Sequence, residues 1–270
     1  MKNKIVFITG STDGIGRQTA LELARMGATI LLHGRNQEKA KVVLKEIKDT
    51  TKNENVKIFT ADLASQSRIR SMTEEIHKQC DRIDIMINNA GVFLTNRRTT
   101  EDGLEMTFAV NHLAPFLLTL LLLDLIEKGA PSRIINVSSM AHSSAIDFNN
   151  LQGEKGHSGY EAYSLSKLCN ILFTYELAER LEGKGITVNC LHPGVINTKL
   201  LRAGWGGGSP VTEGSKTSVY LASAPELDTV SGKYFVNKAQ AKSSSISYDR
   251  DVGKRLWKIS EKLTKVYSHV

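Results

Sequence analysis

The chain has 270 residues, 41% of them apolar, which suits one α/β domain with a sizeable core. Its three cysteines, Cys80, Cys169 and Cys190, lack framework spacing; this excludes a disulfide-stapled fold and indicates free thiols in a reducing, cytoplasmic compartment. Most of the net charge of +7 lies in residues 233–270, which contain nine Lys and Arg and three Asp and Glu. Because no nucleic-acid-binding motif accompanies this basic segment, no nucleic-acid partner is expected.

Short runs of β-branched and apolar residues alternate with longer helical patterns along the whole chain. The runs are nearly continuous in hydrophobicity, as strands covered on both faces are. This alternation predicts a parallel, doubly wound α/β sheet, whose ligand lies beyond the carboxyl ends of the strands. The predicted strands are "KIVFITG" (4–10), "ATILLHG" (28–34), "VKIFTADL" (56–63), "IDIMINNAG" (83–91), "RIINVSS" (133–139), "ITVNCLHPG" (186–194) and "GKYFV" (232–236).

The stretch "TGSTDGIG", residues 9–16, follows the first predicted strand and opens a helix, and no signal peptide is visible before it. Gly10 allows a sharp turn, and Gly14 and Gly16 let backbone N–H groups approach a pyrophosphate at the helix N-terminus. The spacing differs from the G-x-G-x-x-G fingerprint, but its place after the first strand predicts a nucleotide site. The alternative is a turn that needs only positive φ.

The end of the second predicted strand indicates which nucleotide binds. Chains that bind NAD place an acid here for the ribose 2′-hydroxyl. This chain reads "LLHGRN" instead, with Gly34 followed by Arg35. An arginine suits a 2′-phosphate by charge and fork geometry, so we expect NADP(H) to be preferred over NAD(H). Asp13 beside the phosphates favours the reverse, and a solvated loop cation is the other interpretation of Arg35.

Two stretches in the second half of the sequence suggest helices of different kinds. The 11 residues of "FLLTLLLLDLI" (116–126) are too few for a bilayer span, which needs about 20, and predict a buried helix. "YSLSK" (163–167) sets a tyrosine four places before a lysine; on a helix these lie about 5–6 Å apart, and the ammonium would lower the pKa of the phenol. "YFVNK" (234–238) has the same spacing, so spacing alone does not decide.

The remaining segments predict loops and a C-terminal helix. Residues 142–159 and 202–210 are expected to be mobile loops near the strand ends. Neither His142 nor His157 has metal-ligand spacing, so no metal site is expected. Residues 249–267 predict an amphipathic helix whose basic face could touch an anionic membrane or a partner, although a docked helix with a solvated face is favoured. Its apolar positions are Val252, Leu256, Ile259, Leu263 and Val266.

Taken together, six ordered motifs resemble those of the short-chain dehydrogenase/reductase family over nearly the whole chain. The resemblance implies one NADP-binding Rossmann-type domain over residues 1–270, with seven parallel strands and helices on both faces. It also places "YSLSK" on the long helix after the fifth strand and leaves "YFVNK" as an accidental copy. The motifs are "TGSTDGIG", "NNAG" (88–91), Asn111 in "VNHLAPF", "NVSS" (136–139), "YSLSK" and "HPGVINT" (192–198).

Carried over by position, the resemblance implies a role for each matching residue. Tyr163 is the proton donor and acceptor, Lys167 lowers its pKa and binds the nicotinamide ribose, Ser139 rather than Ser138 polarises the substrate carbonyl, and Asn111 holds a proton-relay water. The implied cofactor contacts are Gly10, Thr12, Gly14, Ile15, Gly16, Arg35, Asp62, Leu63, Asn89, Ala90, Gly91, Tyr163, Lys167, Pro193, Gly194, Ile196 and Thr198.

These residues predict an oxidoreductase that interconverts an aldehyde or ketone and an alcohol. Hydride transfer leaves charge on oxygen, which needs a hydrogen-bond donor and a proton. Within the family the chain looks most like the retinol-dehydrogenase-like branch, which implies a lipophilic substrate, and its apolar helices at 116–126 and 163–181 imply a homodimer or homotetramer. The alternatives are an NADP(H) sensor without turnover and an S-adenosylmethionine methyltransferase, neither of which needs Ser139, Tyr163 and Lys167.

Overall fold

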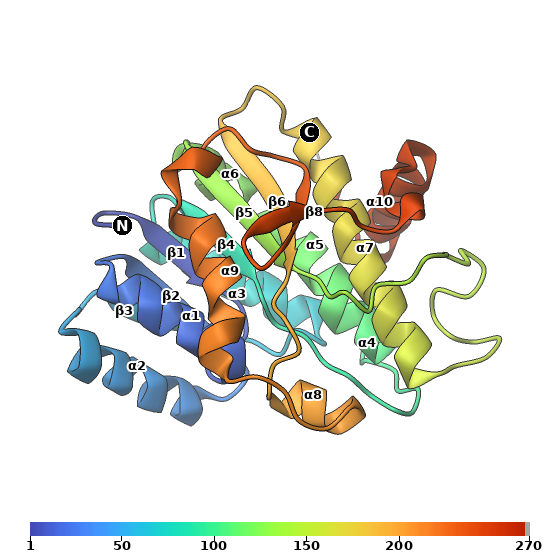
Figure 1. Ribbon diagram of the computed structural model, residues 1–270, viewed down its shortest axis with the longest axis horizontal. Coiled ribbons are helices and arrows are strands. Elements are labelled where there is room, and N and C mark those ends of the chain that lie inside the picture. Colours follow the sequence, from blue (N-terminus) through green and yellow to red (C-terminus); the bar gives the residue numbers. More distant parts are fainter. Residues whose placement is uncertain (268–270) are drawn as a thin grey trace.

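The structure is a computed structural model that describes residues 1–267, and it is built around one eight-stranded sheet (Figure 1). Seven strands run parallel in the order β3-β2-β1-β4-β5-β6-β7, and β8 pairs antiparallel with β7. The doubly wound α/β architecture expected from the sequence is confirmed. The strands are β1 (Ile5–Ile8), β2 (Thr29–Gly34), β3 (Val56–Thr60), β4 (Ile85–Asn88), β5 (Ser132–Val137), β6 (Ile186–His192), β7 (Lys233–Val236) and β8 (Ala239–Ala241).

The seven predicted parallel strands are present, and the sheet has an eighth, antiparallel strand that the sequence did not predict. Strand β8 has only three residues, "AQA", and carries no β-branched or aromatic signal. It forms because Asn237 and Lys238 both adopt positive φ, 50° and 65°, and this turn folds the chain back onto β7. Lys238 of "YFVNK" therefore lies in a hairpin turn, away from any helix.

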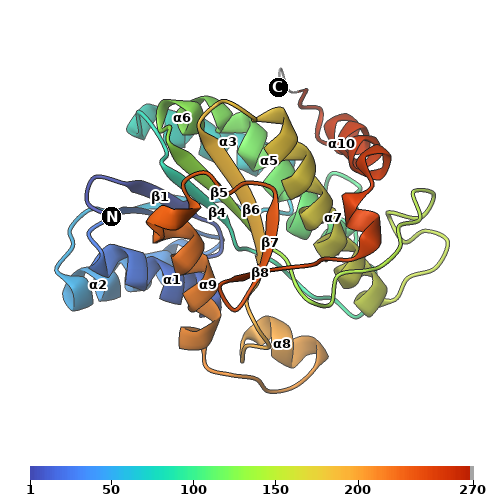
Figure 2. The ribbon, with the colours of Figure 1, turned by 45° about the horizontal axis from the view of Figure 1, so that its top comes forward.

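The helices form two layers, one on each face of the sheet (Figure 2). Because side chains alternate along a strand, Val6 and Ile8 of β1 join the cluster that contains α1, α2 and α9. Phe7, between them, joins the cluster that contains α3, α5, α6 and part of α7. The α-helices are α1 (Gly14–Arg25), α2 (Gln37–Thr51), α3 (Gln66–Gln79), α4 (Met106–Phe108), α5 (Ala114–Leu121), α6 (Leu123–Lys128), α7 (Gly159–Arg180), α8 (Lys199–Gly204), α9 (Val211–Ser223) and α10 (Arg250–Thr264).

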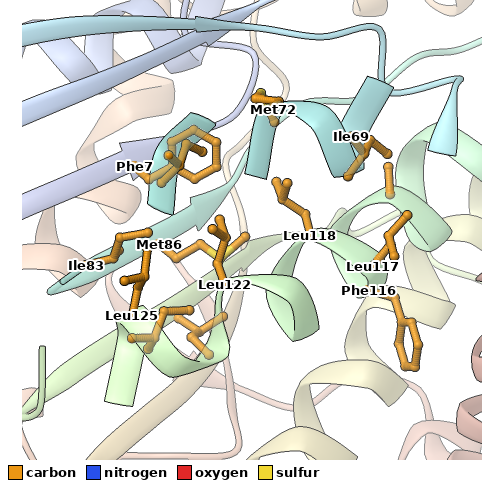
Figure 3. Close-up of a cluster of buried hydrophobic side chains, with 14 of the residues drawn as sticks. Phe7, Ile69, Met72, Ile83, Met86, Phe116, Leu117, Leu118, Leu122 and Leu125 are labelled. Atoms are coloured by element: carbon orange, nitrogen blue, oxygen red, sulfur yellow. The ribbon is translucent and has the colours of Figure 1, made fainter. Parts of the chain in front are cut away.

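Most of the apolar run at 116–126 is buried as expected, but it forms two helices and not one. Helix α5 ends and α6 begins around Leu122, whose side chain is fully buried. Figure 3 shows Leu117, Leu118, Leu122 and Leu125 among the side chains packed beneath the sheet. No helix among residues 1–267 is both long and apolar enough to cross a bilayer.

The C-terminal helix α10 is docked, as favoured from its sequence. Leu256 packs in a cluster with residues of α7, and the Trp257 ring contacts the rings of Phe116 and Phe173 at centroid distances of 4.9 and 5.9 Å. Its exposed residues include Lys254, Lys258 and Lys262, and Lys265, directly after the helix, is exposed as well. The loop expected at 142–159 has neither helix nor strand up to α7, whereas the one expected at 202–210 begins inside α8.

Replacing Leu256 with alanine should lower the free energy of unfolding by about 3 kcal/mol, since a buried leucine loses both its transfer energy and its packing. Thermal or urea unfolding measures the change. The control is Lys258→Ala on the exposed face of the same helix, which should change little. Equal stability of the two variants would show that α10 does not pack in solution as described.

Candidate active site

A cavity of about 830 Å³ opens at the carboxyl ends of the parallel strands. It lies where the strand order reverses between β1 and β4, the point at which doubly wound sheets bind ligands. Every site residue expected from the sequence lines this cavity except Gly16 and Asn111, which are buried just behind its wall. The fold therefore brings together residues that are spread over almost 190 positions, from Gly10 to Thr198.

The glycine loop forms one end of the cavity. Gly10 and Gly14 adopt positive φ, 64° and 51°, which side chains rarely tolerate. A Cβ on Gly16 would lie 2.4 Å from the Asn89 amide nitrogen, so this glycine permits close packing of α1 against the end of β4. The Gly14 N–H donates to the carboxylate of Asp13 at 2.9 Å. The N–H groups that follow in the first turn of α1 have no partner within the helix, and such groups suit a phosphate. These features fit the pyrophosphate of a dinucleotide.

His33 supports this loop and was missed from the sequence. Its Nδ1 accepts a hydrogen bond from the Gly10 N–H at 3.1 Å, so Nε2 carries the proton and donates to the Ala61 carbonyl at 3.3 Å. Burial lowers the pKa of His33 to about 4, which keeps the ring neutral and able to accept. The only sequence signal was a histidine that interrupts an apolar strand.

Arg35 and Asp62 lie together at the ends of β2 and β3. The Arg35 guanidinium is largely exposed and lies 4.0 Å from a carboxylate oxygen of Asp62. A Cβ on Gly34 would meet the Thr12 side chain at 2.4 Å, so a larger residue at position 34 would collide with the glycine loop. Leu63 is buried and lines the same wall. This end of the cavity thus offers one cation and one carboxylate to an approaching group.

The segment "NNAG" joins β4 to the glycine loop. Asn89 donates its side-chain amide to the carbonyl of Thr9 at 2.9 Å, and the Thr9 hydroxyl accepts from the backbone N–H groups of Asn89 and Ala90, both at 3.0 Å. A Cβ on Gly10 would lie 2.9 Å from the Ala90 Cα. Gly91, next along, lines the cavity. These contacts hold the β1 and β4 ends at fixed separation.

Asn111 lies in a π-helical turn (Ala109–Leu113) between α4 and α5, and its side chain is fully buried. Its amide nitrogen donates to the Val92 carbonyl and to the Ser166 hydroxyl, each at 3.0 Å, and its amide oxygen accepts from the Val92 N–H at 2.7 Å. Both amide hydrogens are therefore in use. The side chain ties the loop after β4 to α7, and only its oxygen retains an acceptor position.

The two serines after β5 have different surroundings. Ser138 donates its hydroxyl to the Lys167 carbonyl at 2.7 Å, which joins β5 to α7. Both serines line the cavity, but the Ser139 oxygen accepts from the Ala141 N–H at 3.1 Å, and its hydroxyl hydrogen is not committed to a backbone carbonyl. This difference favours Ser139 as the residue that faces a substrate.

Tyr163 and Lys167 lie one turn apart on α7, as expected for "YSLSK" on a helix. Both are buried and both line the cavity. The Lys167 ammonium lies 5.5 Å from the centre of the Tyr163 ring and donates to the Val137 carbonyl at 3.0 Å. Phenol, ammonium and the Ser139 hydroxyl thus converge at the end of the cavity away from Arg35.

The electrostatics of this pair differ from the sequence-based expectation. Burial raises the pKa of Tyr163 to about 12, and hydrogen bonding with the Ser139 side chain only partly opposes it. Burial also lowers the pKa of Lys167 to about 8. In the protein alone the net effect on the phenol is therefore a raised pKa, because desolvation exceeds the opposing effect of the Ser139 hydrogen bond. The lowering of this pKa by the Lys167 ammonium stays a prediction.

The segment after β6 forms the last wall. Pro193, Gly194 and Ile196 line the cavity, and the Thr198 hydroxyl caps α8 by accepting from the Leu201 N–H at 3.2 Å. Lys199, not anticipated from the sequence, forms an ion pair with Asp13 beside the glycine loop. The Lys199 ammonium lowers the pKa of Asp13 and offsets its negative charge at the place where a phosphate would lie.

Comparison with known proteins identifies the family to which this chain belongs. Residues 4–205 match the family model described as short chain dehydrogenase. The chain is 45% identical to human retinol dehydrogenase 13 over 96% of this chain and 84% of that protein, and 39% identical to human retinol dehydrogenase 14 over 97% and 86%. The solved structure of an uncharacterized protein from Mycobacterium paratuberculosis matches with a TM-score of 0.84 and 30% identity, covering 100% of this chain and 96% of that one. The resemblance drawn from the six motifs is confirmed, and the chain belongs to the short-chain dehydrogenase family.

Proposed function

We propose that this oxidoreductase interconverts a lipophilic aldehyde or ketone and its alcohol with NADP(H), using Tyr163 as the general acid and base. One observation carries the proposal. The glycine loop and Arg35 form one end of a single cavity, and Ser139, Tyr163 and Lys167 converge at the other. A dinucleotide held at the first end would extend toward the second, and it would supply the hydride.

The protonation states of the pair suit carbonyl reduction near neutral pH. With a pKa of about 12 the Tyr163 phenol carries its proton, and with a pKa of about 8 Lys167 is mostly charged. When a carbonyl carbon is reduced, charge develops on its oxygen. Ser139 can donate a hydrogen bond to this oxygen, and Tyr163 can deliver the proton. In the reverse direction the same phenol would have to accept a proton.

Two observations favour a lipophilic substrate. The wall near Tyr163 carries apolar side chains, among them Met140, Val195, Leu200 and Leu201. Retinol dehydrogenase 13, 45% identical to this chain, is named for an apolar alcohol. An apolar substrate gains free energy when such a wall removes it from water.

The direct test is a screen for NADPH consumption over aldehydes and ketones that range from short and polar to long and apolar. We expect turnover that increases toward the apolar compounds. Binding of NADPH without turnover of any compound would instead favour a cofactor sensor.

The preference for NADP(H) depends on Arg35. An exposed guanidinium at the end of β2 can form paired hydrogen bonds with a 2′-phosphate, and it replaces the acid that would hold a ribose hydroxyl. Asp62, 4.0 Å away, is the charge that such a phosphate would have to approach. We infer that the attraction of the 2′-phosphate to Arg35 exceeds its repulsion by Asp62, and that NADP(H) is therefore favoured over NAD(H).

Arg35→Glu should weaken NADPH binding by roughly 10–100-fold, because the 2′-phosphate loses a hydrogen bond to a charged group. NADH binding should change much less. Fluorescence titration of both cofactors measures the ratio. Arg68→Glu provides the same charge change on exposed α3 outside the cavity and should leave the ratio unaltered. An unchanged NADPH preference in Arg35→Glu would remove this residue from cofactor selection.

Assembly and location stay predictions. Pairing of two or four copies through the helices at 116–126 and 163–181 is expected from their apolar sequence. A size measurement in solution would test it. Cytoplasmic location is likewise an expectation from the cysteine pattern; all three cysteines are buried and unpaired.

A further inference from the structure

Four aromatic side chains pack against one another at the catalytic end of the cavity, and two of them, Tyr163 and Trp205, line it; we call Phe93, Tyr160, Tyr163 and Trp205 the aromatic cluster. The Trp205 ring lies 5.4 Å from that of Tyr163, 4.7 Å from that of Phe93 and 6.1 Å from that of Tyr160, centre to centre. Phe93 also contacts the edge of Tyr163 at 5.8 Å. Trp205 therefore packs directly on the tyrosine proposed to transfer the proton.

The segment that carries Trp205 is weakly anchored. Helix α8 has no buried residue, and residues 202–210 are all exposed (Figure 1 shows α8 apart from both helix layers). Its contacts with the body include the Asp13–Lys199 ion pair and the packing of Gly204 on Phe93, where a Cβ would lie 3.1 Å from the ring. At its far end, backbone hydrogen bonds join Ser209 to the segment after β6. Segments with few buried contacts open locally at low free-energy cost.

The mouth of the cavity is apolar as well as exposed. Met140, Tyr160, Val195 and Trp205 are 63%, 51%, 50% and 43% exposed. They are four of the eight large hydrophobic side chains exposed within residues 1–267. Met140, Val195 and Trp205 line the cavity, and Tyr160 packs against Trp205. Exposed apolar side chains that cluster in this way mark a binding surface, whereas scattered ones do not.

We propose that Trp205 is a specificity-determining lid residue of this site: its indole covers Tyr163 and moves aside for a substrate with a large apolar body, against which it then packs. This inference rests on the proposed function. Because Trp205 is almost half exposed, its withdrawal from Tyr163 uncovers little additional apolar surface. A large apolar substrate replaces the lost ring contacts with its own. A short carbonyl compound makes no such contact and gains nothing from the indole.

The kinetic test compares cinnamaldehyde with propanal in the wild type, Trp205→Ala and Trp205→Phe, with NADPH as cofactor. In Trp205→Ala the KM for cinnamaldehyde should rise about tenfold, because the substrate loses an aromatic contact and the apolar area buried with it. The KM for propanal should rise less than about twofold. Trp205→Phe keeps a ring and should recover most of the loss. Tyr267→Ala, which removes an exposed aromatic residue outside the cavity, should match the wild type for both aldehydes.

An equal change in the KM of both aldehydes, or none in either, would overturn the proposal. So would a loss of NADPH affinity in Trp205→Ala, because the indole would then act on the cofactor and not on the substrate.

A second readout does not depend on turnover. The chain has two tryptophans, so in Trp257→Phe the emission reports Trp205 alone. Titration with cinnamamide, an unreactive analogue, should shift this emission and change its quenching by acrylamide, and propionamide should do neither. Absence of a response to cinnamamide would contradict movement of Trp205. If the wild type reduces no aldehyde but the emission responds, the proposed reaction fails while the lid stands.

Discussion

Tyr163→Phe should abolish most turnover, lowering kcat/KM by about 10²–10⁴-fold, while NADP(H) affinity stays nearly intact. The substitution removes one oxygen and leaves the ring. The ring contacts with Phe93 and Trp205 should therefore survive, together with the shape of the cavity. What is lost is the only phenol that lines the cavity within residues 1–267.

The magnitude follows from the two tasks of this hydroxyl. In reduction it supplies a proton to the developing alkoxide, and in oxidation it accepts one. Ser139 can still donate a hydrogen bond to the oxygen, so a residual rate should persist. Measured with a good aldehyde substrate, the fall should be seen mainly in kcat, because the interaction is made in the transition state.

Tyr160→Phe is the matched control. Tyr160 lies one turn earlier on α7, is exposed, and belongs to the same aromatic cluster, yet its hydroxyl has no assigned task. Both variants lose one phenolic oxygen from the same helix. If Tyr163→Phe retains activity close to that of Tyr160→Phe, the proton comes from another group and the assignment of Tyr163 fails.

The strands could be predicted from sequence, but their ends could not. All seven predicted strands extended past the observed carboxyl end or began one or two residues early, because apolar and small residues continue beyond the ladder. The residues that were predicted as strand but lie beyond the observed strand ends are informative. Five of them lie just past the last residue of an observed strand and line the cavity: Gly10, Asp62, Asn89, Ser139 and Gly194. The pattern identifies the site but not the point where pairing stops.

Other features depend on tertiary contacts that a motif does not encode. The support of Gly10 by His33 joins two strands, and the packing of Trp205 on Tyr163 joins a surface segment to a buried helix. The net rise in the Tyr163 pKa was not anticipated for the same reason. Spacing on a helix gives the distance to Lys167, whereas burial, which dominates, is set by elements far away in the sequence.

Lys167→Met should remove activity and yet relieve a stability penalty. The Lys167 pKa is lowered from 10.5 to about 8 by burial, so the folded protein holds this charge at a cost. In the wild type the unfolded chain binds more protons between these two values, so stability due to this group rises with pH across that window. The penalty is fully present below about pH 8 and is on the order of 3 kcal/mol.

The pH dependence separates this effect from the lost hydrogen bond. Methionine cannot donate to the Val137 carbonyl, which lowers the stability of the variant by a similar amount at every pH. The difference in unfolding free energy between Lys167→Met and the wild type should therefore favour the variant most near pH 7 and decline steadily toward pH 10.5. Lys155→Met, at an exposed position, should show no such slope.

If the difference in unfolding free energy between Lys167→Met and the wild type does not change between pH 7 and 10.5, Lys167 is not desolvated in solution. The ammonium beside Tyr163 would then be better hydrated than described. A declining difference together with a loss of kcat/KM of about 10²–10⁴-fold would show a buried charge kept for reaction at the expense of stability. Surface lysines carry no such penalty, so the site alone would account for it. The slope therefore tests the electrostatic premise of the proposed reaction without requiring the substrate to be known.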